Sequence, residues 1–95
     1  MAKISELKAG QGQVNTDVEI ISIEEPREFD KFGKKLRVAN AMVKDDSGEI
    51  KMSFWNDDIE KIQPGAKLKI INGYVSEFKG EKQLTTGKFG KFEVA

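Results

Sequence analysis

Residues 50–55, with the sequence IKMSFW, alternate apolar and polar side chains. Because successive side chains of a β-strand point to opposite faces, this alternation predicts a strand that buries its three apolar residues. The opposite face would carry Lys51, Ser53 and Trp55. The only tryptophan of the chain is therefore predicted to lie on the solvent-facing surface of a sheet, beside a lysine. A large ring in that setting is a candidate platform for a flat, anionic ligand such as a nucleic-acid base.

Further strands are predicted on both sides of this one, at residues 13–25, at 36–44, from residue 67 to a hairpin turn at 78–81, and at 82–87. Asp and Gly residues within 44–48 predict the turn that joins the second strand to the third. The apolar period slips in the first strand and again near Asn72 and Gly73, which predicts a bulge in each. Residues 28–35, which follow Pro26, are expected to form a charged loop.

Two short helical segments complete the pattern. A polar turn is expected at 4–10, with Ser5 as a candidate cap, and a brief helix after Asn56, with Asn56 as its N-cap and Pro64-Gly65 as its end. Five strands with a short helix between the third and the fourth predict an all-β, five-stranded Greek-key barrel that forms a single domain over residues 1–95. This order is that of the oligonucleotide/oligosaccharide-binding (OB) fold. Its ligands bind to the second and third strands and to the loops that join strands one to two and four to five.

The composition narrows the classes of function. The 95 residues contain no His and no Cys, so the commonest metal ligand, the usual general base and the thiol nucleophile are all missing. We therefore expect no metal site, no cofactor and no enzymatic activity. No apolar run approaches the roughly 18 residues of a membrane span, and the N-terminus lacks the apolar core of a secretory signal. These features predict no membrane association and a cytoplasmic location.

The charges are unevenly distributed although their sum is zero. Residues 26–37 hold five cations against two acids, and residues 79–95 hold four cations against two acids. If the two segments meet in space, a neutral protein presents one positive face. Lys34, Lys79 and Lys88 are the candidate contacts to a phosphate backbone from these segments, and scattered surface lysines are the alternative.

Arg37 lies in the second predicted strand and is expected to point outward if Leu36 and Val38 face the core. Its planar guanidinium could then grip a phosphate or stack on a base. In the preceding loop, one of Phe29 and Phe32 is expected to pin the loop to the barrel. Phe32 is favoured as the exposed ring because a lysine and a glycine flank it.

Six short motifs carry a resemblance to a known family. They are DSG at 46–48, SFWND at 53–57, IQPG at 62–65, NGY at 72–74, FKG at 78–80 and LTTGK at 84–88. In this order and spacing they resemble the small single-stranded-DNA-binding proteins of archaea and their eukaryotic relatives, among them the DNA-binding subunit of the SOSS complex. They are also similar to the OB-fold domains of replication protein A. The resemblance covers most of the chain and implies an archaeal-type binder of single-stranded DNA.

The resemblance also implies a site. In that family, bases stack on aromatic side chains of the third and fourth strands and of the following hairpin, which corresponds here to Trp55, Tyr74 and Phe78. The family often has a further aromatic residue on the last strand, where this chain has Thr85. That departure implies a shorter or weaker site, in which the Thr85 hydroxyl could contact a sugar or phosphate.

The preferred interpretation is a non-catalytic protein that binds single-stranded DNA in replication, repair or recombination, by stacking bases on the barrel face and holding phosphates with its basic loops. One alternative is a protein-interaction OB module of a larger assembly with little affinity for single-stranded DNA, for which the zero net charge and Thr85 argue. An RNA-binding OB domain is another. Trp55 could also pack over the short helix as a lid on the core. Other OB domains and replication or repair proteins are the candidate protein partners.

Overall fold

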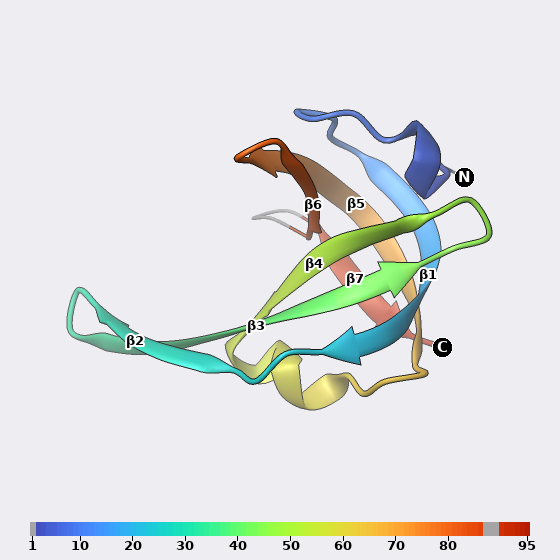
Figure 1. The fold of residues 1–95 in the computed structure, drawn as a ribbon. Helices are drawn as coiled ribbons and strands as arrows, with labels where there is room; N and C mark the ends of the chain where they lie inside the picture. Colours follow the sequence, from blue (N-terminus) through green and yellow to red (C-terminus); the bar gives the residue numbers. More distant parts are fainter. Residues whose placement is uncertain (1, 87–89) are drawn as a thin grey trace.

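The computed structural model describes residues 2–86 and 90–95, which form a small closed barrel of strands (Figure 1). The described elements are η1 (Ile4–Glu6), β1 (Val14–Ile23), β2 (Arg27–Lys31), β3 (Lys34–Lys44), β4 (Glu49–Trp55), η2 (Asn56–Lys61), β5 (Lys67–Phe78), β6 (Glu81–Thr85) and β7 (Lys91–Val94). Both η1 and η2 are short 3-10 helices. The predicted all-β class and the short helical segment between the third and fourth predicted strands are therefore confirmed.

Five of these strands form the barrel. They are hydrogen-bonded in the order β1-β3-β4-β6-β5, and β5 pairs with β1 to close the ring. The pairing between β4 and β6 is parallel, whereas the other pairings are antiparallel. These are the five strands predicted from the sequence. Two additional strands extend the sheet: β2 pairs with β3, and β7 pairs with β5.

The interior of the barrel is filled by aliphatic side chains and Phe54, which is 2% exposed. On β4 the buried residues alternate with partly exposed ones, as the sequence predicts. Leu7, directly after η1, is 1% exposed and belongs to the same cluster. Phe92 of β7 also packs on this cluster, edge-on to Phe54 with a centroid distance of 5.3 Å. The N-terminal segment and β7 therefore cover the core.

Both predicted irregularities are found. The β1–β3 register shifts between Ile20 and Ser22, which lets β1 bend while it serves two sides of the barrel. The β1–β5 register shifts as well: Val14 faces Gly73, and Thr16 faces Ile70. The extra residue on the β5 side is accommodated next to Asn72, whose φ is 55°. After this bulge, alternate side chains of β5 change faces, so Tyr74 points outward while Val75 is fully buried.

Residues 28–35 differ from the expected loop. They form most of a two-stranded arm, β2 with the start of β3, that projects from the barrel (Figure 1). The two strands are joined at Phe32 and Gly33, whose φ values are 53° and 76°. Two successive positive φ values give a tight turn whose twist matches that of a hairpin. A Phe-Gly pair is a weaker sequence signal for this turn than Asn-Gly, which explains why the hairpin was not predicted.

The predicted helix caps are wrong in both segments. The N-cap of η1 is Lys3 rather than Ser5, and the N-cap position of η2 is occupied by Trp55, with no side-chain cap in either case. Asn56 has a φ of 52°, and its side chain accepts a hydrogen bond from the backbone N–H of Arg37 on β3 instead. Asn56 therefore ties η2 to the neighbouring strand rather than capping its own helix.

Candidate nucleic-acid interface

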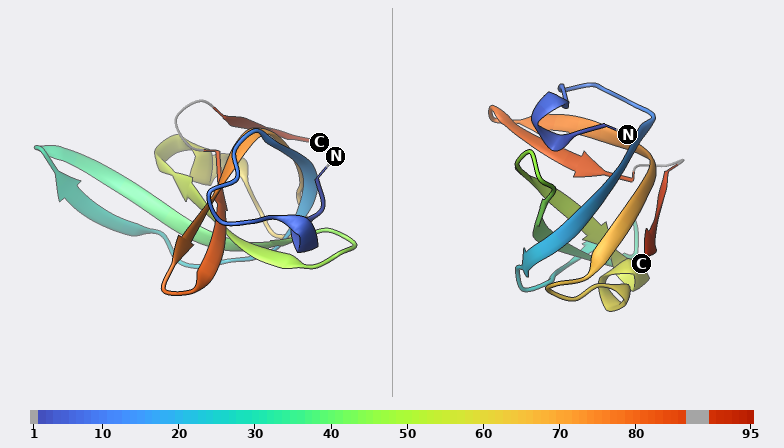
Figure 2. Two further views of the ribbon diagram at one scale, coloured as in Figure 1. Left: turned by 90° about the horizontal axis from the view of Figure 1, so that it is seen from above. Right: turned by 90° about the vertical axis from the view of Figure 1, so that its right-hand side faces the viewer.

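One outer face of the sheet runs from the β2–β3 arm across β4 to the β5–β6 hairpin. The tips of the two hairpins both lie at the left in Figure 1, and in the left view of Figure 2 the β2–β3 arm points to the left and the β5–β6 hairpin to the bottom. The strand registers define which side chains lie in each row of this face. One row consists of Met42, Lys51, Gln83 and Ser76, each opposite the next on the adjoining strand.

Trp55 lies on this face at the end of β4 and is 43% exposed, so the predicted orientation is confirmed. It stands opposite Val38 on β3. The ring of Phe29, on β2, meets the indole edge-on with a centroid distance of 6.0 Å and an interplanar angle of 81°. Such a pair contributes about 0.5–1.5 kcal/mol beyond the burial of its area. The arm therefore supports one side of the indole, and part of the indole stays open to solvent.

Phe29 was not singled out from the sequence as a site residue. It pairs across the arm with Leu36 and is 38% exposed, whereas Phe32 at the tip of the arm is 92% exposed. The expected division between an anchoring and an exposed phenylalanine is confirmed. What the sequence did not indicate is that Phe29 is anchored to Trp55.

Tyr74 and Phe78 share the outer side of β5, because they alternate with the buried Val75. Glu77 is exposed but has the parity of Val75, so it points away from this side. Tyr74 is 44% exposed and stands opposite Thr85, and Phe78 is 63% exposed and stands opposite Glu81. The structure thus brings Trp55, Tyr74 and Phe78 onto one face.

The tips of the two hairpins resemble each other. At each tip a lysine ammonium lies near an exposed phenylalanine ring: Lys31 Nζ is 5.7 Å from the Phe32 centroid, and Lys79 Nζ is 5.4 Å from the Phe78 centroid. Lys34 begins β3 opposite Lys31 and is exposed. Both ends of the face therefore combine an aromatic ring with positive charge, which is the chemistry that suits a base and its phosphate.

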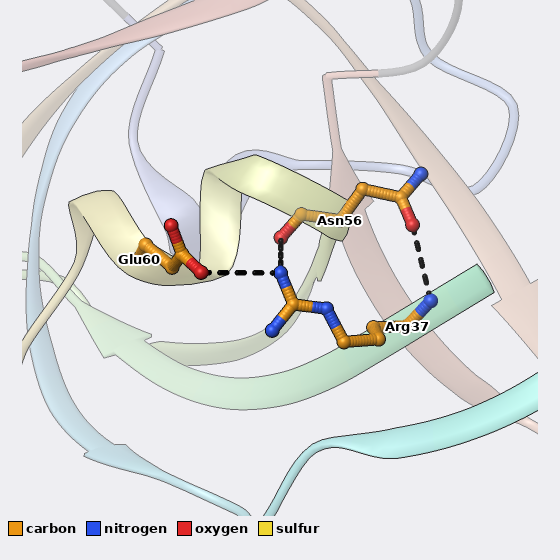
Figure 3. Close-up of polar contacts among 3 residues, drawn as sticks. All are labelled: Arg37, Asn56 and Glu60. Carbon is orange, nitrogen blue, oxygen red and sulfur yellow. Dashed lines mark hydrogen bonds and ion pairs between the residues drawn. The ribbon is translucent and has the colours of Figure 1, made fainter. Parts of the chain in front are cut away.

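The orientation expected for Arg37 is wrong. The small residues Ala39 and Ala41 of β3 are buried, so the residues of the other parity, including Val38, form the outer face. Arg37 has the parity of the buried residues, and its guanidinium is directed at η2 (Figure 3). There Nη2 lies 3.3 Å from Oε1 of Glu60 and donates to the backbone oxygen of Asn56 at 3.4 Å.

Lys51 and Ser53 are on the predicted face, and both have partners. Lys51 Nζ forms an ion pair with Glu81 Oε2 at 3.6 Å, and the Ser53 hydroxyl donates to Oδ1 of Asn40 at 2.9 Å. Lys51 and Glu81 line a hollow of about 400 Å³ that also borders Met42 and Lys82. A phosphate in this hollow would meet an ammonium group and a carboxylate at the same point.

Thr85 and Lys88 complete the set of predicted site residues. Thr85 is partly exposed and lies opposite Tyr74, on the same face as the aromatic residues. Lys88 lies outside the described residues.

Residues 2–86 and 90–95 contain no group of three or more carboxylates placed to hold a metal ion. Within the same ranges no helix is long and apolar enough to cross a membrane.

A carboxylate with a shifted pKa, Asp45, lies away from this face, in the β3–β4 turn. Partial burial of the Asp45 carboxylate acts to raise its pKa, but hydrogen bonds from the Ser47 side chain and from the backbone N–H groups of Ile4, Ser47 and Gly48 lower it. The hydrogen bonds prevail, and the pKa of Asp45 lies below its ordinary value. Asp45 therefore has a structural role, since it connects η1 to the turn.

Comparison with known proteins gives a family and a sequence relative. The family of Ssb-like single-stranded DNA binding proteins with an OB fold matches residues 9–94. The single-stranded DNA binding protein Ssb of Saccharolobus solfataricus is 29% identical over 93 residues, which make up 98% of this chain and 63% of that protein. The chain thus spans less than two thirds of the length of this relative.

Solved structures match over nearly the whole chain. The replication factor A related protein from Methanobacterium thermoautotrophicum aligns with a TM-score of 0.81 and 26% identity, covering 100% of this chain and 90% of that one. A hypothetical protein from Arabidopsis thaliana gives a TM-score of 0.83 at 23% identity, over 99% and 72% of the two chains. A chain of a replication protein A heterotrimer bound to single-stranded DNA gives 0.78 at 20% identity, over 100% and 24%. These likenesses confirm the predicted OB fold.

Proposed function

The chain belongs to the OB-fold family of Ssb-like single-stranded DNA binding proteins, and from this membership we propose that it binds single-stranded DNA by stacking bases on Trp55, Tyr74 and Phe78. The membership confirms the resemblance found in the sequence motifs. A protein of this family is a non-catalytic binder. The free energy of its contacts with single-stranded DNA therefore determines how well it functions.

One observation carries the proposal: Trp55, Tyr74 and Phe78 are 43%, 44% and 63% exposed on a single face. Leaving three large rings in water is unfavourable, and each presents a surface that a base can cover. Stacking on an aromatic side chain is worth about 1–3 kcal/mol per base and tolerates any sequence, because every base has a π-face.

The spacing of the three rings favours three different bases. Strands lie about 4.8 Å apart, and residues two apart along a strand lie about 7 Å apart. By these values the backbones of Trp55 and Tyr74 are separated by roughly 12 Å, and those of Tyr74 and Phe78 by roughly 13 Å. The ring contact of Trp55 in the described part of the chain is with Phe29. Each ring is thus available to a base of its own along an extended strand.

Lysines at both ends of the face supply the contacts to phosphates. Lys34 and Lys79 stand at the two hairpins and Lys51 between them, and we include Lys88 on sequence grounds. Lys51 is paired with Glu81, so we count Lys34, Lys79 and Lys88 as the three phosphate contacts. They predict a slope of about −2 for the logarithm of the binding constant against that of the salt concentration, at roughly −0.7 per contact. Phe32 at the arm tip adds a further ring, and the Ser53 and Thr85 hydroxyls can bond to sugars or phosphates.

The proposal also covers the cellular process, the location and the partners of this binding. We propose that residues 1–95 form one OB domain that binds single-stranded DNA rather than RNA. It would act in replication, repair or recombination, in the cytoplasm of an archaeal-type cell. Other OB domains and replication or repair proteins are the partners to test, since a single small site gains strongly from a linked second one. The support is the family itself and the likeness to the archaeal replication factor A related protein.

The test is binding of a fluorescently labelled oligothymidylate to the wild type and to Trp55→Ala, Tyr74→Ala and Phe78→Ala. Each variant should bind about 5- to 100-fold more weakly, as expected for one lost base stack. A ribose oligomer of equal sequence and a duplex serve as competitors. Tighter binding of the ribose oligomer than of the deoxyribose oligomer would favour RNA. Absence of binding to any of them would favour the protein-interaction module.

A further inference from the structure

We propose that Arg37 and Asn56 form a clamp that holds Trp55 in position for stacking, and that Arg37 is a positioning residue rather than a contact to phosphate. The proposal rests on the proposed function, because it concerns the orientation of its central ring. It also makes a prediction about the DNA-free protein that does not depend on binding.

The clamp consists of two hydrogen bonds between β3 and the residue that follows Trp55. The backbone N–H of Arg37 donates to Oδ1 of Asn56 at 3.1 Å, and Nη2 of Arg37 donates to the backbone oxygen of Asn56 at 3.4 Å (Figure 3). The same Nη2 lies 3.3 Å from Oε1 of Glu60. One arginine therefore fixes both the side chain and the main chain of Asn56 and connects them to η2.

Asn56 occupies the point at which the direction of the chain changes. It has a φ of 52° directly after the last residue of β4. Val38 opposite Trp55 is the last paired position of β4 with β3, so beyond it the sheet no longer holds the chain. Asn adopts positive φ more readily than most residues do. The Arg37 bonds therefore stabilise the backbone conformation that determines where the Trp55 side chain leaves the strand.

The geometry also separates Arg37 from the phosphate path. Val38 and Trp55 lie on the outer face, and Arg37 has the opposite parity on its strand. The Arg37 side chain is 34% exposed, and its Nη2 already has two oxygen partners. The indole is therefore held at two places, by the ring of Phe29 and by the clamp at the adjoining backbone.

The experiment compares Arg37→Lys, Arg37→Met and Asn56→Gly with the wild type, and Lys35→Met is the control. Lys35 is an exposed cation two residues before Arg37 on the same strand, with the same parity, so it does not lie on the face of Trp55. Lysine keeps the charge but lacks the second nitrogen of the fork. Glycine keeps the positive φ but removes the Oδ1 acceptor. Asn56→Asp keeps both the acceptor and the tolerance of positive φ, so it is the rescue variant.

Two properties are measured. The first is the near-ultraviolet circular dichroism and the emission maximum of Trp55 in the DNA-free protein. We expect both to change in Arg37→Lys, Arg37→Met and Asn56→Gly, and to stay as in the wild type in Lys35→Met and Asn56→Asp. The second is binding to oligothymidylate as a function of salt. We expect affinity to fall about fivefold in the first three variants, near the lower limit for one base stack, with an unchanged salt slope.

Two results would overturn the clamp. One is a salt slope reduced by about 0.7 in Arg37→Met but retained in Arg37→Lys, with an unchanged Trp55 spectrum, since this is the signature of a phosphate contact. The other is wild-type spectra and affinity in all three variants. Far-ultraviolet circular dichroism shows whether each variant folds. If the two Arg37 variants do not fold, Asn56→Gly alone tests the clamp. Absence of DNA binding by the wild type would refute the proposed function, while the DNA-free spectra would still test the clamp.

Discussion

The rings of Phe29 and Trp55 meet edge-on, with centroids 6.0 Å apart and planes at 81°. Phe29 belongs to β2 and Trp55 to β4, and β3 lies between them in the sheet. The contact therefore joins the projecting arm to the face of the barrel. A DNA strand that stacks on Trp55 would meet a ring that Phe29 already holds in place.

Replacement of Phe29 by Leu should weaken binding to oligothymidylate by about 2- to 10-fold, because it removes an aromatic pair worth about 0.5–1.5 kcal/mol. The emission of Trp55 should shift to longer wavelength, since the indole gains contact with water. For the emission shift, Phe32→Leu is the control, because Phe32 lies at the tip of the arm and is 92% exposed. Equal spectral shifts in the two variants would show that the Phe29 contact does not order the indole.

Replacement of Glu81 by Gln should tighten binding to single-stranded DNA. Glu81 is paired with Lys51 at 3.6 Å, and exposed pairs of this kind contribute at most about 1 kcal/mol, so a phosphate can displace the carboxylate but must compete with it. We expect an affinity gain of about 2- to 5-fold and a salt slope steeper by roughly 0.7.

Glu77→Gln is the matched control for Glu81, because it removes the same charge from the same hairpin. Glu77 alternates with Ser76 and Phe78 and therefore points away from the face. If both variants gain affinity equally, the gain comes from the change in total charge. Glu81 would then not compete with a phosphate for Lys51.

Removal of the lysines at the two ends of the face should act mainly on the salt dependence. With Lys34 and Lys79 both replaced by Ala, the slope should fall from about −2 to about −0.7. The double variant Lys67→Ala and Lys69→Ala removes the same charge from β5 beside β1 and β7. An equal loss of slope in that control would contradict a localised phosphate path.

Asp45 should make the stability of the fold depend on pH in acid. Its carboxylate accepts hydrogen bonds from the backbone of Ile4, Ser47 and Gly48 and from the Ser47 hydroxyl, at 2.6 to 3.1 Å, and these lower its pKa. Because the folded pKa lies below the unfolded one, the stabilisation is complete above the unfolded pKa, near 3.9. It is lost as the pH falls through the folded pKa.

Asp45→Asn should therefore lower the free energy of unfolding at pH 7 by about 1–2 kcal/mol, and thermal melts at several pH values measure this loss. The difference from the wild type should shrink as the pH falls below about 4. Asp46→Asn, at the adjacent exposed position, should melt like the wild type. A constant difference between Asp45→Asn and the wild type down to pH 2 would argue against an ionised carboxylate as the source.

The sequence was most informative where side chains alternate cleanly. The alternation over residues 50–55 predicted the orientation of β4 correctly, because Ile50, Met52 and Phe54 all have room in the core. On β3 both parities are apolar, and size was misleading: Ala39 and Ala41 fit the crowded interior, while the larger Leu36 and Val38 lie on the outer face beside Phe29 and Trp55. The orientation of Arg37 was wrong for the same reason.

The remaining differences depend on contacts between distant segments. The Phe29–Trp55 pair requires the arm to fold back along β3, and the turn that permits it contains Phe32 at positive φ, which sequence propensity disfavours. The bonds of Asn56 to Arg37 replaced the helix cap expected from local pattern. Local patterns identified the five strands of the barrel and the exposed Trp55, and the family resemblance added Tyr74 and Phe78. Tertiary contacts decided how Trp55 is held.

The central claim is that bases stack on Trp55, and the most direct measurement is a titration of its fluorescence. Trp55 is the only tryptophan of the chain, so the signal has a single source. An oligothymidylate of about 15–20 nucleotides exceeds the footprint of one OB fold in most binding modes. We predict saturable quenching at low salt that weakens with a slope near −2 as salt is added. Unchanged fluorescence of the folded protein at low salt would contradict stacking on Trp55.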